Sequence, residues 1–104
     1  MKDLSYKNFM NKDMSGYDFS NTNLMGCNFR DSILVGCNFS GSLLHFSNFK
    51  GADVSKAIFN KDTKASMTPW YNDKTAIKGI DTAIGVNLVD TLTPPPEDDS
   101  DEEE

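Results

Sequence analysis

Large hydrophobic residues recur at every fifth position through the first part of this chain. The series is Leu4, Phe9, Met14, Phe19, Leu24, Phe29, Leu34, Phe39, Leu44, Phe49, Val54 and Phe59. The residue two places before each member is small from Thr22 onward, and the residue directly before it is usually Asp or Asn. Glycine often stands two places after it. A period of five matches neither an α-helix, which repeats every 3.6 residues, nor a strand, which repeats every two.

Regular self-similarity of this kind is typical of repeat proteins, in which each unit buries its apolar side chains only against its neighbours. The pattern small–Asp/Asn–Leu/Phe–x–x resembles that of the pentapeptide-repeat family. The resemblance covers residues 1–60 and implies an all-β fold, a short right-handed quadrilateral β-helix with four pentapeptides in each coil. It also implies that the large and small positions point inward. Residues 1–60 would then make about three coils.

If four repeats make a coil, residues twenty apart stack and the core consists of four columns. Two columns are aromatic and two are aliphatic. The aromatic columns are Phe9–Phe29–Phe49 and Phe19–Phe39–Phe59, and the aliphatic columns are Leu4–Leu24–Leu44 and Met14–Leu34–Val54. Bulky rings thus alternate with slimmer side chains around each coil, as close packing of the interior requires.

The repeat fades after Phe59, and we expect three parts: a β-helix at residues 1–60, a capping or dimerisation segment at residues 61–93, and a Pro-rich spacer with a disordered acidic tail at residues 94–104. A helical spacing in the second part predicts a small helical or irregular cap. Its members are Ile77, Ile80, Ile84 and Leu88, with Asp73 as a candidate N-cap. A short extended alternation at Val86, Leu88 and Leu92 is the other interpretation of this segment.

Two aromatic residues, Trp70 and Tyr71, are expected in a loop within this second part. A solenoid needs its last coil covered, so the loop and the following segment are interpreted as a cap over the open end. The alternative is a dimerisation element, because two such ends can also meet each other.

The formal charge of −6 is unevenly distributed. Seven of the sixteen acids lie in the last eight residues: Glu97, Asp98, Asp99, Asp101, Glu102, Glu103 and Glu104. The other nine acids stand against ten Lys and Arg residues, so residues 1–96 carry a charge of about +1. Three interpretations of the tail stay open: solubility, steering toward a basic partner such as a nucleic-acid-binding protein, and occupation of that partner's DNA groove.

One face of the predicted solenoid carries a candidate interaction patch. Apolar residues stand where the repeat expects Asp or Asn, at Ile33, Leu43 and Ile58. The outward set on the Leu24 and Leu44 face is Tyr6, Met25, Leu43, His45 and Phe46. Exposed apolar patches on small soluble domains usually mark contacts. The alternative is that the C-terminal segment folds back over this face.

The first coil departs from the repeat because lysines occupy its small inward position, at Lys2, Lys7 and Lys12. An unpaired ammonium is costly to bury, so the lysines must reach solvent. One interpretation is a charged end that keeps an exposed β-edge from pairing with other chains. The other is a basic rim that docks an acidic partner, including the acidic tail of a neighbouring copy.

Catalysis and cofactor binding find no support in the residue inventory, which lacks a nucleophile–base motif, a phosphate-binding loop and metal-ligand spacing. Cys27 and Cys37 fall on inward positions and are expected to pack in the core. A metal site would need His45 as a third ligand, and His45 is expected to point outward. No apolar leader or membrane-length stretch is apparent, so we expect the cytoplasm or the interior of a virion.

These observations favour a non-catalytic interaction or structural module, with a protein partner that carries a basic surface. A homo-oligomer or a place in a larger assembly, such as a phage particle, fits the same features, and direct binding of nucleic acid or membrane is not expected. The alternative comes from the resemblance, since some pentapeptide-repeat proteins mimic DNA and protect or inhibit gyrase. Here mimicry would act through the acidic tail, because the solenoid itself is not acidic.

Overall fold

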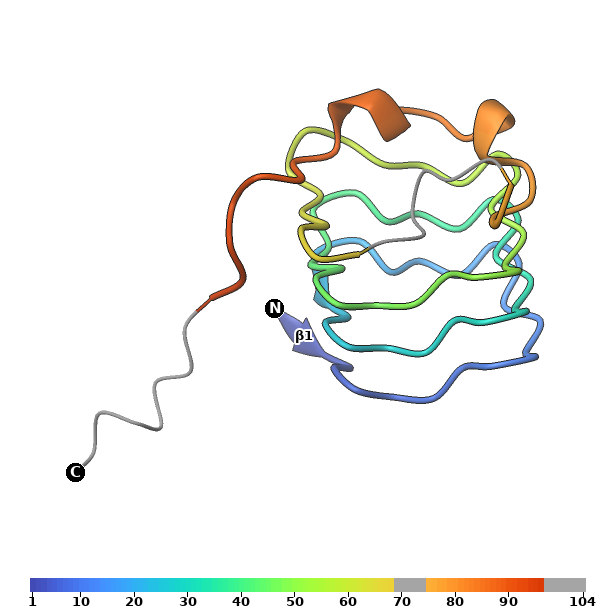
Figure 1. The fold of residues 1–104 in the computed structure, drawn as a ribbon, viewed down its shortest axis with the longest axis horizontal. Coiled ribbons are helices and arrows are strands. Elements are labelled where there is room, and N and C mark those ends of the chain that lie inside the picture. The colour runs from blue at the N-terminus through green and yellow to red at the C-terminus, as the bar shows by residue number, and fades with distance from the viewer. Residues whose placement is uncertain (69–74, 97–104) are drawn as a thin grey trace.

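The computed structural model describes residues 1–68 and 75–96 of this chain. Its backbone winds into a stack of four-sided coils (Figure 1). Strand β1 (Lys2–Asp3) pairs with strand β2 (Thr22–Asn23) in a parallel two-stranded sheet, with Lys2 opposite Thr22. Elsewhere the coils are joined by isolated parallel bridges rather than by longer strands. Short bridges separated by turns are what a five-residue repeat with a corner in every unit produces.

The register of the bridges confirms that residues twenty apart stack. Asn8 pairs with Asn28, and Asn28 pairs with Asn48. The same offset joins Asp18 to Asn38 on another face. Each of these pentapeptides therefore lies directly above the one four repeats earlier, so four pentapeptides make one coil.

The ladder continues beyond the boundary that the sequence pattern predicted at residue 60. Leu43 pairs with Lys64, which is one residue further along than the regular offset, and Lys64 pairs in turn with Asp90. Five successive rungs therefore stack on this face, at Asp3, Asn23, Leu43, Lys64 and Asp90. The described parts of residues 61–93 thus extend the stack past the expected three coils, and the boundary after residue 60 corresponds to a one-residue insertion rather than to a structural break.

Within residues 75–96 the C-terminal segment is irregular rather than one continuous helix, which is one of the two forms of cap that the sequence allowed. It contains two 3-10 helices, η1 (Ile80–Thr82) and η2 (Val86–Leu88), which form part of the last coil at the top of the stack (Figure 1). Parallel bridges hold the backbone extended at Lys78 and Ile84, so the segment cannot coil continuously. Ile77 and Ile80 are buried as the helical spacing required, but Ile84 and Leu88 are exposed. The expected N-cap, Asp73, lies outside the described residues.

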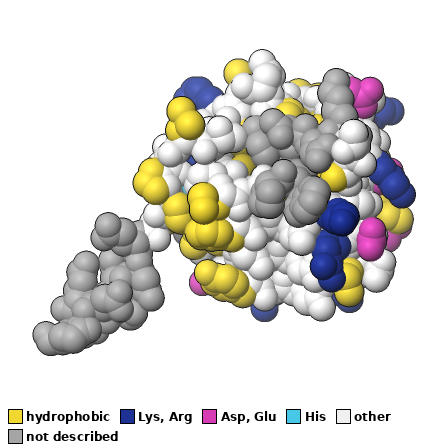
Figure 2. Space-filling model, in the orientation of Figure 1, with side chains coloured by type: hydrophobic (Ala, Val, Ile, Leu, Met, Phe, Trp, Pro, Cys, Tyr) yellow, Lys and Arg dark blue, Asp and Glu magenta, His cyan; other side chains and the backbone are white. Residues whose placement is uncertain are grey.

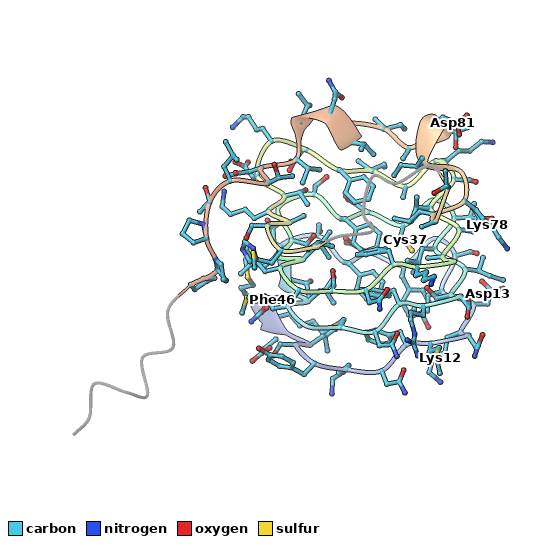
Figure 3. The ribbon with its side chains drawn as sticks, in the orientation of Figure 1. Lys12, Asp13, Cys37, Phe46, Lys78 and Asp81 are labelled. Atoms are coloured by element: carbon cyan, nitrogen blue, oxygen red, sulfur yellow. The ribbon has the colours of Figure 1, made fainter. Side chains whose placement is uncertain are left out.

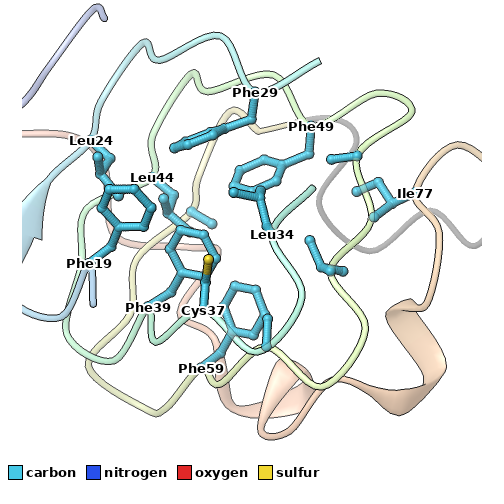
Figure 4. Close-up of a cluster of buried hydrophobic side chains, with 14 of the residues drawn as sticks. Phe19, Leu24, Phe29, Leu34, Cys37, Phe39, Leu44, Phe49, Phe59 and Ile77 are labelled. Atoms are coloured by element: carbon cyan, nitrogen blue, oxygen red, sulfur yellow. The ribbon is translucent and has the colours of Figure 1, made fainter. Parts of the chain in front are cut away.

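The predicted core columns are present. Ring centroids lie 5.3 Å apart for Phe9 and Phe29 and 4.9 Å apart for Phe29 and Phe49, and the rings are stacked. The second aromatic column is equally regular, at 5.6 Å and 5.3 Å along Phe19, Phe39 and Phe59. The two columns touch edge to face across the core, and the aliphatic residues Leu24, Leu34 and Leu44 fill the rest (Figure 4).

Asp and Asn recur before the large residue because their side chains close the turn that follows. The Asn8 carboxamide oxygen accepts a hydrogen bond of 3.0 Å from the Met10 amide. Asp13 accepts from the Ser15 amide at 3.1 Å and from the Ser15 hydroxyl at 2.8 Å. These are Asx turns, in which a side chain replaces a backbone acceptor at the corner that follows. The polar position of the repeat is therefore a local folding signal before it is a surface feature.

The last coil reverses the large and small positions of the repeat. Its bridges place Ile77 beside Ala52 and Val89 beside Thr63, so large side chains lie over small ones. They also place Gly85 beside Phe59, and a Cβ at Gly85 would meet the Phe59 carbonyl oxygen. This reversal lets the chain cross over the large core residues at close range.

We expect alanine to be much less tolerated at Gly85 than at Gly36. Both residues have positive φ, so each substitution costs the left-handed strain of about 1–2 kcal/mol. A Cβ at Gly36 meets nothing within 4 Å, whereas one at Gly85 meets backbone. Gly85→Ala should therefore lower the free energy of unfolding by a total of about 3 kcal/mol. Urea unfolding of both variants measures the difference, and equal losses would contradict the close approach at Gly85.

Candidate interaction surface

One corner of the stack carries a vertical column of exposed large apolar side chains. The Tyr6 amide donates to the Met25 carbonyl at 2.8 Å, and the Gly26 amide donates to the His45 carbonyl at 2.9 Å. These bonds stack Tyr6, Gly26 and Phe46, and the shifted register places Met67 next. The exposed fractions are 72% for Tyr6, 48% for Phe46 and 66% for Met67. We call Tyr6, Phe46 and Met67 the apolar corner.

The backbone of the apolar corner is strained. Tyr6, Phe46 and Met67 have φ values of 62°, 64° and 60°, in the left-handed region that disfavours side chains with a Cβ. Each such residue costs about 1–2 kcal/mol relative to glycine. Glycine occupies the same corner at Gly26, where a Cβ would collide with the Tyr6 ring. Large apolar residues thus occupy positions where glycine would relieve the backbone strain and would leave no apolar side chain exposed to water.

The face drawn in Figure 2 has a cluster of hydrophobic side chains at the left and most of its Lys, Arg and acidic side chains at the right, with some of each kind elsewhere. Phe46 lies on the hydrophobic side, and Lys78 and Asp81 lie on the opposite side (Figure 3). On this face the described surface is therefore richer in apolar side chains around the corner of Phe46 and richer in charge on the other side.

The structure brings together only part of the predicted patch. Tyr6 and Phe46 are exposed as expected, whereas Met25 and Leu43 are half-buried. Met67 was not among the predicted residues, although it belongs to the same corner. The spacing of Thr63 and Thr68, five residues apart at buried small positions, is the signal that could have extended the repeat to include it.

The expectation that His45 points outward is wrong, because its side chain is completely buried. Its Nδ1 atom forms a 2.7 Å hydrogen bond with the hydroxyl of Ser66, which belongs to the additional rung after the insertion. Within the described residues its Nε2 atom has no hydrogen-bond partner. Burial lowers the pKa of His45 below its ordinary value of about 6.5; the contact with Ser66 opposes this effect, and Lys64 adds to it.

Both cysteines are free and buried in the core, as predicted. The Cys27 thiol donates to the Leu4 carbonyl at 3.1 Å, and the Cys37 thiol donates to the Met14 carbonyl at 3.0 Å. Burial raises the pKa of Cys27, and it raises the pKa of Cys37 to about 11. Such thiols are structural rather than reactive.

Other features of the surface concern charge and the residues that the structure leaves undescribed. Lys2, Lys7 and Lys12 are exposed at the open end of the first coil. Of the residues described, no group of three or more His, Cys, Asp or Glu side chains is arranged to hold a metal ion. No helix in the same ranges is long and apolar enough to cross a membrane. The predicted contact residues Trp70 and Tyr71 and the seven tail acids lie outside the described residues.

The family model for pentapeptide repeats matches residues 3–31 and 22–60, with eight copies of the repeat. These ranges carry the regular part of the stack and include Tyr6 and Phe46 of the apolar corner. No curated protein matches the sequence.

We expect protonation of His45 to destabilise the fold. Because its pKa is lower in the folded chain, the unfolded chain binds the proton first as the pH falls. The free energy of unfolding should therefore decrease from pH 7 to pH 5 and should do so less in His45→Gln. The aspartates with shifted pKa values titrate lower, so they do not obscure this window. Urea unfolding at both pH values tests this, and an unchanged slope in the variant would contradict it.

We expect Cys27 and Cys37 to resist thiol reagents in the folded protein. With a pKa of about 11, only about one Cys37 side chain in a thousand is a thiolate at pH 8, and both sulfur atoms are buried. Ellman's reagent should detect almost no thiol in native protein and both thiols in urea. Rapid reaction of either cysteine without denaturant would show that its coil opens.

Proposed function

Because this chain belongs to the pentapeptide-repeat family, we propose that it acts as a non-catalytic protein-interaction module whose docking surface is the apolar corner. The β-helix would serve as a rigid support that holds this surface in one geometry. A rigid surface loses little conformational freedom on binding, which favours association without a large contact area.

The observation that carries the proposal is the strained, exposed column of Tyr6, Phe46 and Met67. Among the described residues, these three keep large apolar side chains in a left-handed conformation and in contact with water. Backbone strain of this kind is concentrated at functional sites, where another requirement outweighs stability. Aromatic residues and methionine are also enriched at the centres of protein interfaces. Partner binding supplies such a requirement here.

The partner proposed for this module is a protein with a basic surface. Seven acids close the sequence, while the preceding residues are nearly neutral. Opposite charges raise the rate of encounter and orient the two proteins, and apolar contact then provides the affinity. Such a pair of contacts suits a component of a larger assembly, such as a phage particle, or a homo-oligomer in which copies meet through their apolar corners.

A second candidate function is inhibition or protection of a DNA-binding enzyme such as gyrase, with the acidic tail imitating DNA. The concentration of acids in residues 97–104 favours it. The described surface does not extend this imitation to the solenoid, because basic side chains stand among the acidic ones (Figure 2). Gyrase supercoiling that is unaffected by the full-length protein would exclude this candidate.

We expect Phe46→Asn to abolish partner binding while leaving the fold intact. Asparagine tolerates the left-handed conformation, so the change removes the ring without adding strain. Lys56→Asn is the matched control, because Lys56 has a φ of 59° at another exposed corner. Tagged proteins would be compared for the polypeptides that they retain from cells of the source organism.

A polypeptide retained by the native protein and by Lys56→Asn, and reduced at least about tenfold by Phe46→Asn, would support the apolar corner as the interface. Circular dichroism and urea unfolding would establish that both variants remain folded. Equal retention by the two variants would exclude the apolar corner as the docking surface.

A further inference from the structure

The first coil ends in an unpaired backbone edge. In the next coil, the amides of Asn28, Ile33 and Asn38 donate to carbonyls of the first coil at 3.0 Å, 2.8 Å and 3.0 Å. The equivalent amides of the first coil belong to Asn8, Asp13 and Asp18. Within the described part of the chain they donate to no acceptor. Such an edge can pair with an added extended segment.

This edge carries positive charge at the positions that are buried elsewhere. Lys2, Lys7 and Lys12 correspond to Thr22, Cys27 and Ser32 of the next coil, which are interior residues. With no coil beneath them, the three lysines are exposed, and Lys12 lies on the lowest coil in Figure 3.

The aspartates of the same coil are bound mainly to neighbouring serines, although Lys7 adds to the Ser5 hydrogen bonds in lowering the pKa of Asp3. Asp3, Asp13 and Asp18 occupy the outward position, and each accepts hydrogen bonds from the serine two residues on, at 2.7 Å, 2.8 Å and 2.6 Å from the hydroxyl. These bonds hold their carboxylates in the corner turns. The ammonium groups therefore belong to the open end, and the carboxylates belong to the sides.

The chain itself contains an acidic segment that can reach this end. The Asp90 carboxylate accepts hydrogen bonds from the Leu92 amide at 2.9 Å and the Thr93 amide at 3.0 Å, which sets the direction in which the chain leaves the last rung. The segment that follows, residues 91–96, runs down toward the level of β1 (Figure 1). Four rung spacings separate Asp90 from Asp3, or about 19 Å, and residues 91–104 span up to ~46 Å when extended.

We propose that residues 97–104 dock on the open edge of the first coil of the same chain, with their carboxylates against Lys2, Lys7 and Lys12. The contact is intramolecular because exposed ion pairs are individually weak and do not hold separate chains together at micromolar concentration. The tether of residues 91–96 raises the local concentration of the acids to about the millimolar range. This inference does not depend on the partner proposed above.

The docked segment would cover the edge and so prevent coils of two copies from pairing end to end. While docked, the acidic segment and the lysine edge would block each other from binding other proteins, and both would become accessible when the contact breaks. A basic partner that captures residues 97–104 would thereby expose the edge, and an acidic partner that takes the edge would release the segment.

Carbodiimide crosslinking of the full-length protein tests this inference, because the reagent joins carboxylates to amines that are in direct contact. An equal mixture of ¹⁴N- and ¹⁵N-labelled protein separates the two cases by mass spectrometry. We expect crosslinks from residues 97–104 to Lys2, Lys7 and Lys12, within chains of one isotope, at least about fivefold above those to Lys78. Lys78 is an exposed lysine on the side of the molecule opposite to Phe46 (Figure 3). One molar salt should suppress these crosslinks.

The double substitution Lys7→Gln and Lys12→Gln should shift the remaining crosslinks away from the edge, whereas the control Lys78→Gln should leave the pattern unchanged. The substituted side chains are exposed, so circular dichroism should show an unaltered fold. Mixed-isotope crosslinks would overturn the inference in favour of contact between copies. Equal yields at Lys78 and at the edge lysines would overturn it in favour of no docking.

Discussion

Parallel hydrogen bonding between residues one coil apart is the interaction on which the rest of this structure depends. Through the regular part of the stack successive rungs keep an offset of twenty residues, as from Asn8 to Asn28 and from Asn28 to Asn48. The last rungs form with extra residues between them, at an offset of 21 from Leu43 to Lys64 and of 26 from Lys64 to Asp90. Once the register is established, equivalent residues of successive coils must lie above one another. The stacked rings of Phe9, Phe29 and Phe49 follow from that condition, while the Asx turns supply the corners locally.

The same condition creates a problem at the ends of the stack, which the chain resolves differently at each end. At the last coil, large side chains take the small positions, as Ile77 does over Ala52, and the core is closed by the chain itself. At the first coil, lysines take the small positions and remain in solvent. One end is thus apolar and covered, while the other is charged and open. The two ends of the stack therefore differ chemically, and only the first coil offers a charged edge on which an acidic segment can dock.

The apolar corner shows how a repeat architecture separates stability from function. The interior columns and the Asx turns hold the coil, so a corner residue can change without disturbing them. Glycine satisfies the left-handed corner best, and the chain uses it at many corners. Tyr6, Phe46 and Met67 occupy three corners of one column instead, where each costs stability. Residues that fit the repeat are explained by folding alone. Residues that depart from it are therefore the ones that indicate function in this chain.

The sequence by itself determined the coil, the inward columns and the burial of Cys27 and Cys37, because these depend on a local period that is repeated many times. It did not determine where the stack ends. A one-residue insertion before Lys64 hides the continuing register, and only pairing with Leu43 restores it in space. For the same reason His45 was expected at the surface, although Ser66 from the additional rung lies against it. The helical spacing of Ile77 to Leu88 led only to two short 3-10 helices, since bridges to the coil below override local preference. The local period is a property of the amino-acid sequence. The contacts of the irregular last coil form only after the preceding coils have provided the surface on which it packs.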